Sequence, residues 1–380
     1  MTHHPSTLTH QPAARARYIM LGGFLGAGKT TAVAALAQHL AASEQRVGLI
    51  TNDQGSELVD TAMLRAKGFC TEEITGGCFC CRFNTLTDAA RRLTETSRPD
   101  AFIAEPVGSC TDLVATVTYP LRRIYGDSFT IAPLSVLVDP VRAERVLGLA
   151  EGGKFSEKVT YIYRKQLEEA DLLVITKTDL LTPERLARLR SELAAQFPHA
   201  EIFAVSVRAG TGLAEWFTRI TTSEQQPRST MQVDYEIYAE GEALLGWLNA
   251  TVQLAAAPAF DSQAVLQTLA AHIQQQLASE GAEIAHLKMT LSPDAGLGDV
   301  AAINVVRSDI VPELSLRLEE PIPSGQLILN CRAECAPERI RDAVRTAVAA
   351  LNKNGLTAAL DHLEYFRPGK PEPTHRELIA

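Results

Sequence analysis

The sequence contains no apolar run that approaches the roughly 18 residues needed to span a membrane. Its first sixteen residues also lack the apolar core of a secretory signal peptide, and we expect residues 1–16 to form a flexible tail on a cytoplasmic protein. Basic residues are outnumbered, with 36 Lys and Arg against 45 Asp and Glu, which gives a formal net charge of −9. A nucleic acid or an anionic membrane would require a basic face. The sequence therefore predicts neither kind of partner.

Cysteine is scarce too, since the 380 residues contain only seven. Three of them, Cys78, Cys80 and Cys81, fall within the segment ITGGCFCCRF at residues 74–83. In a reducing compartment, an odd and clustered set of cysteines indicates metal or redox chemistry rather than a disulfide framework. A structural zinc site more often shows two separated cysteine pairs, and this chain has no second C-x-x-C pair. The cluster therefore needs a chemical explanation of its own.

The length and the 46% hydrophobic content predict two domains, because single cores stop growing near roughly 250–300 residues. The first half alternates short apolar runs with stretches of three- and four-residue apolar spacing, which is typical of a mostly parallel sheet flanked by helices in an α/β domain. We expect strands at residues 18–21, 47–50, 101–104, 134–138, 172–175 and 202–205 and near Phe69, and helices over 30–40, 85–96, 183–197 and 213–220.

A polar segment, TTSEQQPRST at residues 221–230, is the predicted linker between an α/β domain over residues 17–221 and a second domain over 231–352. The second domain is predicted to be a smaller α+β unit of the split βαβ type. Its expected strands are 248–254, 284–291, 301–306 and 327–331, and its expected helices are 262–279 and 337–351. The remainder, 353–380, ends in the proline-rich YFRPGKPEPTHRELIA and is predicted to be an extended tail.

The segment GFLGAGKT at residues 23–30 matches G-x-x-x-x-G-K-[ST] between an expected strand and an expected helix, and so predicts a P-loop rather than an ordinary glycine-rich turn. The glycines let backbone N–H groups face phosphate oxygens at a helix N-terminus. Lys29 is expected to bridge the β- and γ-phosphates, and the Thr30 hydroxyl is expected to bind Mg²⁺. The predicted nucleotide-binding positions of this segment are Gly23, Gly26, Ala27, Gly28, Lys29, Thr30 and Thr31.

A second element, TKTD at residues 176–179, follows an expected strand and is the predicted site of base recognition. The Asp179 carboxylate can accept hydrogen bonds from N1–H and the 2-amino group of guanine, a donor pair that adenine lacks. Lys177 is expected to pack along the P-loop, and Ser206 begins a base-side loop, SVRAG. The usual GTPase element starts with Asn where this chain has Thr176. The alternative is that Asp179 caps the helix beginning near residue 183.

Two segments between these elements are predicted to sense the γ-phosphate, ITNDQGSELVD at residues 50–60 and IAEPVGSCTD at 103–112. Glu105 leaves a strand parallel to the P-loop strand, where an acidic residue can hold a Mg²⁺-bound water or orient the attacking one. The N–H of Gly108 is expected to reach the γ-phosphate, which makes Lys29, Glu105 and Gly108 the candidate catalytic groups. Asp53 is a candidate Mg²⁺ or second-metal ligand. Helix capping remains an alternative for both acids.

The three thiols are soft ligands suited to Zn²⁺ and Co²⁺, and Gly76 and Gly77 allow the backbone to fold them around one ion. They supply at most three ligands, so the fourth position stays open to a carboxylate, a water or a partner, as transfer of the ion would require. Vicinal redox thiols are the alternative. Cys110, two positions after Gly108, is placed to report the nucleotide state to the metal.

The ordered set GFLGAGKTT, ITNDQG, ITGGCFCC, AEPVG, VLVDP and ITKTD resembles the CobW-type metal-chaperone GTPases over roughly residues 17–221. The resemblance implies GTP binding, with GDP as product, and slow hydrolysis coupled to delivery of zinc or cobalt to a client metalloprotein or a cobalamin-pathway enzyme. It implies metal binding by Cys78, Cys80 and Cys81, phosphate and Mg²⁺ binding by Lys29 and Thr30, and guanine binding by Asp179. The family's Asn-Glu-Phe-Gly-Glu segment reads NDQGS at residues 52–56, which leaves open whether Asp53 or Glu57 joins the metal site.

Two other functions fit the same residues, namely a P-loop ATPase or kinase with redox-sensing cysteines and a nucleotide-gated scaffold that recruits a partner through the second domain. Base preference and metal retention separate the first from a metallochaperone, and undetectable turnover would indicate the second. A homodimer is compatible with all three. The remaining candidate metal ligands have simpler interpretations. We expect His3, His4 and His10 to lie in a solvated tail, and Cys331 and Cys335 to pack in a hydrophobic core.

Overall fold

The computed structural model describes residues 15–52, 59–295, 299–353 and 355–379. Asp53 and Glu57, and the three N-terminal histidines, therefore lie outside the described residues. Within the described residues, no helix is both long enough and apolar enough to cross a membrane.

The first domain is built on a sheet in the order β3-β2-β4-β1-β6-β7-β8, with β5 also beside β1, and every pairing is parallel. The strands are β1 (Ala16–Gly23), β2 (Val47–Asn52), β3 (Thr71–Ile74), β4 (Ala101–Glu105), β5 (Phe129–Ile131), β6 (Ser135–Val138), β7 (Leu172–Ile175) and β8 (Glu201–Ala204). The expected mostly parallel sheet is confirmed. The short β5 was not predicted, and β3 begins beyond Phe69.

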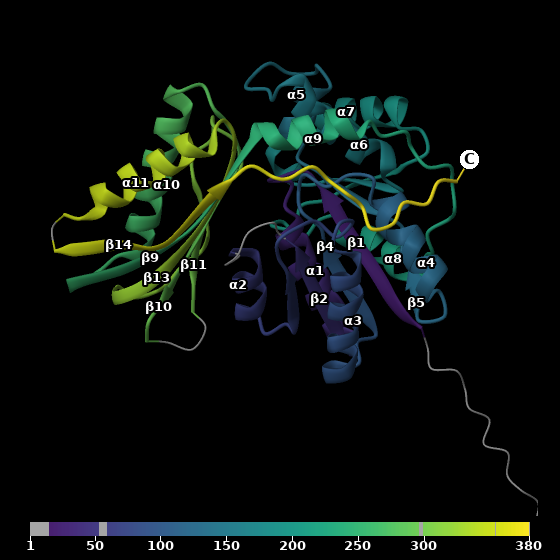
Figure 1. Cartoon of the computed structure of the whole chain (residues 1–380), viewed down its shortest axis with the longest axis horizontal. Coiled ribbons are helices and arrows are strands. Elements are labelled where there is room, and N and C mark those ends of the chain that lie inside the picture. The colour runs from purple at the N-terminus through teal and green to yellow at the C-terminus, as the bar shows by residue number, and fades with distance from the viewer. Residues whose placement is uncertain (1–14, 53–58, 296–298, 354, 380) are drawn as a thin grey trace, which may run out of the picture.

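Helices cover both faces of this sheet (Figure 1). They are α1 (Lys29–Ala42), α2 (Val59–Ala66), α3 (Phe83–Ser97), α4 (Tyr119–Tyr125) with a π-helical turn before it (Val114–Thr118), α5 (Pro140–Val146), α6 (Glu157–Glu169), α7 (Pro183–Gln196) and α8 (Leu213–Thr222). The alternation along β1 shows why both faces must be covered, because Tyr18 and Met20 are buried in one hydrophobic cluster and Ile19 and Leu21 in another.

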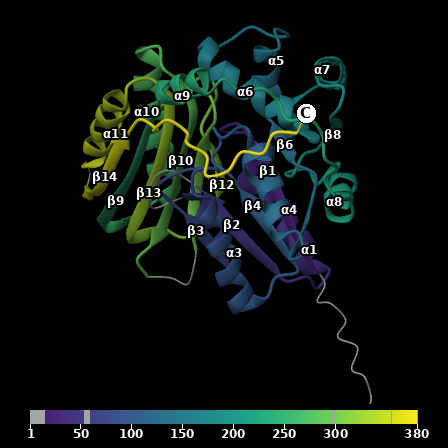
Figure 2. The same ribbon diagram turned by 45° about the vertical axis from the view of Figure 1, so that its right-hand side comes forward.

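The second domain is an antiparallel sheet in the order β12-β11-β10-β13-β9-β14, with two helices. Its elements are β9 (Leu245–Phe260), α10 (Ser262–Ser279), β10 (Glu283–Pro293), β11 (Ala301–Val305), β12 (Glu313–Leu316), β13 (Ile322–Glu334), α11 (Pro337–Leu351) and β14 (Leu356–Phe366). Strands β9 and β10 are both antiparallel to β13, which lies between them, so β9-α10-β10 is a split βαβ unit. The predicted α+β fold is confirmed. Figure 2 shows α10 and α11 on the side of this sheet that faces away from the first domain.

Strand β12 and helices α2, α4, α5 and α6 were not predicted, and two further differences change the expected domain boundaries. A helix that was not predicted, α9 (Tyr235–Leu244), follows the linker, and its Tyr238 is buried in the same cluster as Ile162 of α6. It therefore packs on the first domain rather than the second. The predicted extended tail begins instead with β14, whose alternating apolar residues pair with β9. Only the chain beyond Phe366 is extended, and it runs back across the first domain (Figure 1).

Candidate nucleotide and metal site

The P-loop connects the end of β1 to the start of α1 and requires its glycines. Gly23, Gly26 and Gly28 have φ angles of 128°, 81° and 92°, in the left-handed region that favours glycine. A Cβ on Gly23 would lie 2.4 Å from the carbonyl oxygen of Leu137. Gly28 caps α1 without a side-chain hydrogen bond, so the backbone N–H groups of the first turn are directed at the space that a phosphate would take.

The structure brings the predicted phosphate and Mg²⁺ residues together. The Thr30 hydroxyl donates to a carboxylate oxygen of Glu105 at 3.0 Å, and both side chains are buried at the ends of neighbouring elements. Lys29 Nζ donates to the carbonyl oxygen of Gly23 at 2.9 Å. A hydroxyl beside a carboxylate fits a hard cation such as Mg²⁺. Glu105 is not a helix cap, because the next helical segment along the chain begins at Val114 and its N-cap is Leu113.

Gly108 packs directly on the P-loop. A Cβ at this position would lie 2.7 Å from a methyl carbon and 3.0 Å from the backbone nitrogen of Leu25, so a larger residue would force the P-loop and this segment to shift. The carbonyl oxygen of Gly108 accepts a hydrogen bond at 2.9 Å from Gln166 Nε2, on α6. The segment that follows β4 is thereby held between the P-loop and α6.

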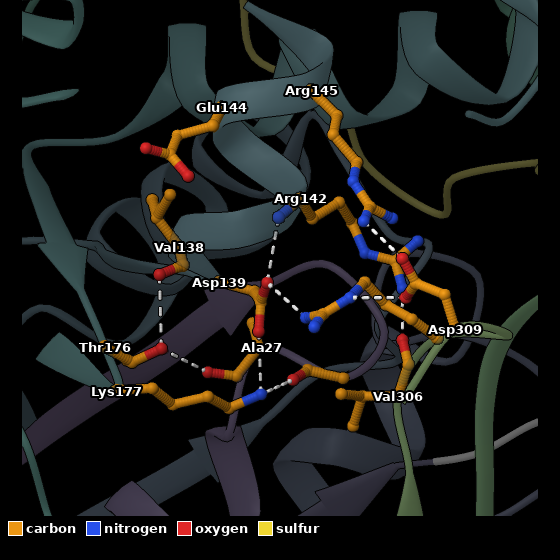
Figure 3. Close-up of polar contacts among 12 residues, drawn as sticks. Ala27, Val138, Asp139, Arg142, Glu144, Arg145, Thr176, Lys177, Val306 and Asp309 are labelled. Atoms are coloured by element: carbon orange, nitrogen blue, oxygen red, sulfur yellow. Dashed lines mark hydrogen bonds and ion pairs between the residues drawn. The ribbon is translucent and has the colours of Figure 1, made fainter. Parts of the chain in front are cut away.

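The predicted base-recognition loop is tied to the P-loop (Figure 3). Lys177, at a φ of 51°, donates from Nζ to the Gly26 carbonyl oxygen at 2.7 Å and to Asp139 Oδ2 at 2.8 Å. The hydroxyl of Thr176 donates to the carbonyl oxygens of Ala27 and Val138 at 2.9 and 3.1 Å. Threonine, which stands where GTPases usually have asparagine, therefore fastens the base loop to the P-loop.

Asp179 is exposed, and its Oδ1 accepts a hydrogen bond at 2.6 Å from the Ser206 hydroxyl, so the two predicted base-side residues meet. The capping alternative does not hold, because the N-cap of α7 is Thr182, whose hydroxyl accepts from the N–H of Arg185. Asp179 is oriented by Ser206 and keeps a second oxygen for another partner.

Asp139, quoted in the sequence only as part of VLVDP, lies at the centre of this network. It caps α5 by accepting from the N–H of Arg142 at 2.9 Å. It also pairs with Lys177 and, at 3.4 Å, with Nη1 of Arg307 from the second domain. Burial raises the pKa of this carboxyl, but Lys177 and Arg142 together outweigh burial and lower the pKa to about 2. Asp139 thus stays charged and joins the base loop to the second domain.

The second domain touches the P-loop itself. A Cβ on Gly26 would lie 2.9 Å from Cβ of Val306 and 3.1 Å from the carbonyl oxygen of Ala285. Arg142 donates to the carbonyl oxygens of the same two residues. Arg145 pairs with Asp309 a few residues further along (Figure 3). Sequence patterns gave no signal for these contacts, because they join segments more than 140 residues apart.

The three thiols converge on the loop between β3 and α3. The Sγ atoms of Cys78 and Cys80 are 2.8 Å apart, those of Cys78 and Cys81 are 3.1 Å apart, and those of Cys80 and Cys81 are 3.7 Å apart. All are free thiols, at distances longer than the roughly 2.05 Å of a disulfide. Gly76 and Gly77, at φ angles of 72° and 151°, make the turn that the sequence predicted.

The environment favours one thiolate in this cluster. Hydrogen bonds from Cys110, Cys80 and Cys81 hold the pKa of the Cys78 thiol well below its usual range. The hydrogen bond with Cys78 raises the pKa of Cys81 to about 11. Cys78 and Cys80 are buried, and Cys81 is partly exposed. A cation that enters from solvent would therefore contact Cys81 first, and Cys78, the thiol with the lowered pKa, lies deeper in the cluster.

Two other segments hold the thiol loop. Asn52, at the end of β2, donates from Nδ2 to the carbonyl oxygens of Ile74 and Gly77 at 3.1 and 2.7 Å. The C-terminal chain crosses the other side, where the N–H of Glu372 points at Sγ of Cys81 from 3.3 Å. No sequence signal indicated this crossing, beyond the prolines in the segment that follows β14. Cys331 is buried among the strands and helices of the second domain, where it packs as a core residue.

The geometry agrees with what comparison with known proteins finds. Residues 17–204 match the family model for the nucleotide-binding domain of CobW/HypB/UreG proteins. The chain is 31% identical over 196 residues to a protein named zinc chaperone CobW from Sinorhizobium sp., covering 47% of this chain and 55% of that protein. It is 31% identical over 168 residues to zinc chaperone YeiR of Escherichia coli, covering 43% of this chain and 47% of that protein.

The chain thus spans about half the length of the curated relatives it matches. Among solved structures, it aligns with the Zn(II)-bound YjiA GTPase from E. coli at 16% identity and a TM-score of 0.36, over 88% of this chain and 99% of that one. The family match covers the P-loop, the thiol cluster and the base loop described above. Over residues 17–204, these findings support a CobW-type P-loop GTPase domain of the kind that the CobW/HypB/UreG model describes.

Proposed function

We propose that the chain is a GTP-hydrolysing metallochaperone that holds one zinc or cobalt ion at Cys78, Cys80 and Cys81 and delivers it to a client metalloprotein or a cobalamin-pathway enzyme. The observation that carries the proposal is the convergence of three free thiols, all within 3.7 Å of one another, on a loop attached to the end of β2. Strand β2 lies beside β4, which lies beside the P-loop strand β1. The thiol loop and the phosphate site therefore share supporting strands.

The donor set fits the proposed cargo. Three thiolates are soft ligands that select zinc and can hold cobalt, whereas Mg²⁺ and Ca²⁺ prefer oxygen. The site retains a partly exposed member, Cys81, through which an ion could enter and leave. A closed structural zinc site would offer no such route.

The nucleotide site would work mainly by positioning. The backbone N–H groups of the P-loop, from Gly23 to Thr31, would cradle the phosphates, with Lys29 neutralising the charge that develops between the β- and γ-phosphates. Mg²⁺, held by Thr30 and by Glu105 directly or through water, would supply further neutralisation when bound. The N–H of Gly108, on a segment packed against Leu25, would hold a γ-phosphate oxygen.

Guanine specificity would come from Asp179. Ser206 occupies one carboxylate oxygen and fixes the orientation of the group. A carboxylate so oriented can accept from both N1–H and the 2-amino group of guanine, while Lys177 packs against the P-loop beside the base. Adenine presents no matching donor pair.

Coupling between the two sites would run through shared segments. Asn52, the last residue of β2, is hydrogen-bonded to the thiol loop. Strand β2 leads directly into the first of the two segments predicted to sense the γ-phosphate. Gly108, in the second such segment, lies two residues from Cys110, which is buried in the same hydrophobic cluster as Cys78 and Cys80. A γ-phosphate that draws these segments together would change the thiol geometry, and the effect on binding must be reciprocal.

The names of relatives support delivery to a client. Curated relatives are called zinc chaperones, and one, from Schizosaccharomyces pombe, is called a zinc-regulated GTPase metalloprotein activator. All seven cysteines are free thiols, which agrees with work in the reducing cytoplasm.

Titration of the reduced protein with Co²⁺ tests the metal site. We expect one ion per chain with a thiolate-to-metal charge-transfer band, and we expect replacement of Cys78, Cys80 and Cys81 by Ser to abolish the band while leaving GTP binding intact. Cys70→Ser, at an exposed cysteine outside the cluster, is the matched control. A reduced wild-type protein that binds Co²⁺ without this band would overturn the proposal and favour redox-sensing thiols.

A further inference from the structure

The C-terminal chain returns from the second domain to the thiol loop of the first (Figure 1). The backbone N–H of Glu372 is directed at Sγ of Cys81 from 3.3 Å. Thr374 makes two hydrogen bonds, from its N–H to the carbonyl oxygen of Cys80 at 2.9 Å and from its hydroxyl to the carbonyl oxygen of Cys81 at 3.1 Å. The chain therefore binds both the backbone of the loop and one of its sulfur atoms.

The sulfur that this chain reaches belongs to the exposed member of the cluster. Cys78 and Cys80 are buried, whereas Cys81 is partly exposed and is the thiol through which an ion could enter or leave. An N–H directed at a sulfur atom favours the thiolate over the thiol, and hydrogen-bond partners of this kind orient metal ligands and tune their affinity. Residues 372–374 therefore lie where they can act on the bound ion.

The sequence around Glu372 suits this contact. Pro371 and Pro373 flank it, and neither has an N–H, so Glu372 supplies the one backbone donor of these three residues. Proline also fixes φ near −65° and keeps the chain extended before it docks. A segment already held in its bound conformation loses less conformational entropy when it binds.

The following residues anchor the chain to the body of the first domain. Arg376 donates from Nε to the buried carboxylate of Asp112 at 2.6 Å. Glu377 makes two contacts, from its N–H to the carbonyl oxygen of Ala115 at 2.8 Å and from its carboxylate to Arg123 at 2.5 Å. The segment is thus fastened beyond the thiol loop as well as on it.

The anchor lies on a segment predicted to sense the γ-phosphate. Asp112 is the last residue of IAEPVGSCTD, and its φ of 65° is uncommon for a residue other than glycine. The Tyr235 hydroxyl donates to the same oxygen of Asp112 at 2.7 Å. The C-terminal chain therefore joins the thiol loop to the end of this segment, and a shift of the segment would act on both.

We propose that residues 372–377 form a strap that belongs to the metal site, in which the Glu372 N–H holds Cys81 and the strap must leave the thiol loop before the ion can be transferred. This inference rests on the proposed metal site. Residues 372–377 belong to no helix or strand, so opening requires no unfolding of either domain.

Opening has a defined set of contacts to break. Leaving the thiol loop breaks the three hydrogen bonds of Glu372 and Thr374 and the edge-to-face contact of the His375 and Phe83 rings, whose centroids are 4.9 Å apart. Removing the whole strap also breaks its anchor, which consists of Arg376 with Asp112, Glu377 with Ala115 and Glu377 with Arg123.

Zinc release from the loaded full-length chain to an excess of chromophoric chelator tests the strap. Glu372→Pro keeps the chain extended but removes the N–H directed at Cys81. We expect release to become about 10-fold faster or more, since loss of a hydrogen-bond partner of a metal ligand typically costs roughly 10- to 100-fold in metal affinity. Glu372→Ala retains the N–H and is the matched control, with release at the wild-type rate.

The Co²⁺-loaded protein gives a signature that a merely structural role would not change. A hydrogen bond to a thiolate lowers the energy of the sulfur lone pairs, so its loss shifts the thiolate-to-cobalt charge-transfer band to lower energy. We expect this shift in Glu372→Pro and not in Glu372→Ala. GTP affinity, which reports the folding of the first domain, should be unchanged in both.

The anchor is tested by Arg376→Ala, which should also speed zinc release, and by Arg376→Lys, which keeps a cation beside Asp112 and should speed it less. Lys370→Ala breaks an exposed pair with Glu236 outside the strap and should release zinc at the wild-type rate. Arg376→Ala leaves a buried carboxylate without its cation, so the two Glu372 variants decide the outcome if Arg376→Ala does not fold.

A wild-type release rate in Glu372→Pro would overturn the inference while leaving the proposed function standing. Equally fast release in Glu372→Pro and Glu372→Ala would also overturn it, because the effect would then belong to the side chain rather than to the N–H. A wild type that holds no zinc would instead overturn the proposed function.

Discussion

The guanidinium of Arg307, in the second domain, lies 3.4 Å from the carboxylate of Asp139, in the GTPase domain. The other oxygen of Asp139 accepts from Lys177 at 2.8 Å. One buried carboxylate therefore links the base loop, through Lys177, to the second domain, through Arg307. We expect nucleotide exchange to depend on a residue that lies about 130 residues beyond the base loop in the sequence.

Replacing Arg307 by Ala tests this link. Asp139 would keep Lys177 but lose one cation, and a hydrogen bond to a charged group contributes about 1.5–3 kcal/mol. We expect GDP dissociation, followed with a fluorescent analogue, to become about 10-fold faster without unfolding of the protein. Arg339→Ala, at an exposed pair with Glu280 in the same domain, is the matched control. Equal dissociation rates for the wild type and Arg307→Ala would show that the contact is only structural.

A second prediction concerns hydrolysis. Glu105→Gln preserves the size of the side chain and its contact with Thr30 but removes the charge proposed to hold Mg²⁺ or its water. We expect kcat for phosphate release to fall by about 100-fold, in the range found for single electrostatic groups in active sites. Glu72→Gln, on β3 and paired with Arg92 away from the P-loop, should leave kcat unchanged. Undiminished turnover in Glu105→Gln would remove this residue from the catalytic set.

The base assignment predicts a change of nucleotide. In Asp179→Asn, an amide N–H replaces one carboxylate oxygen and can face the 2-carbonyl of xanthine, where guanine has an amino group. We expect GTP affinity to fall by a few kcal/mol and XTP affinity to rise, with ATP bound weakly by both proteins. Competition against labelled GDP measures all three. Wild-type GTP affinity in Asp179→Asn would mean that the base is recognised elsewhere.

Burial of Glu169 predicts a pH dependence of stability. Burial, and then the nearby Asp112, raise the pKa of this carboxyl to about 8. The folded state then keeps a proton that the unfolded state loses above about pH 4.3, so stability is full at low pH and falls by about 1.4 kcal/mol per pH unit between those values. We expect Glu169→Gln to flatten the decline of the unfolding temperature from pH 5.5 to 8. Glu168→Gln, at the exposed neighbour, should not flatten it.

Much of the first domain could be predicted because its signals are local. Buried parallel strands such as Leu172–Ile175 are continuous apolar runs, and the P-loop glycines are required by the backbone itself. Strand β3, with the sequence TEEI, lies at the edge of the sheet and carries no such run, so only a piece near Phe69 was expected. The three-residue β5 is too short to show a pattern.

The parts of the site that escaped prediction depend on contacts between distant segments. In the sequence, Asp139 has only the local pattern of a helix cap, and its pairs with Lys177 and Arg307 exist only in the folded chain. Glu372 is 291 residues from Cys81, and prolines on both sides of it indicate an extended chain without indicating where that chain lies. Helix α9 was not predicted, and its residues fell within the range 231–352 expected for the second domain, because an apolar pattern does not show which domain a segment packs against.

The central claim is that nucleotide state and metal affinity are coupled, and it is tested most directly by measuring zinc affinity in the presence of a non-hydrolysable GTP analogue and of GDP. Competition with a chromophoric chelator gives both values under the same conditions. The account predicts that they differ by about 5- to 150-fold, a coupling free energy of about 1–3 kcal/mol. Equal zinc affinities in the two nucleotide states of the wild type would contradict it.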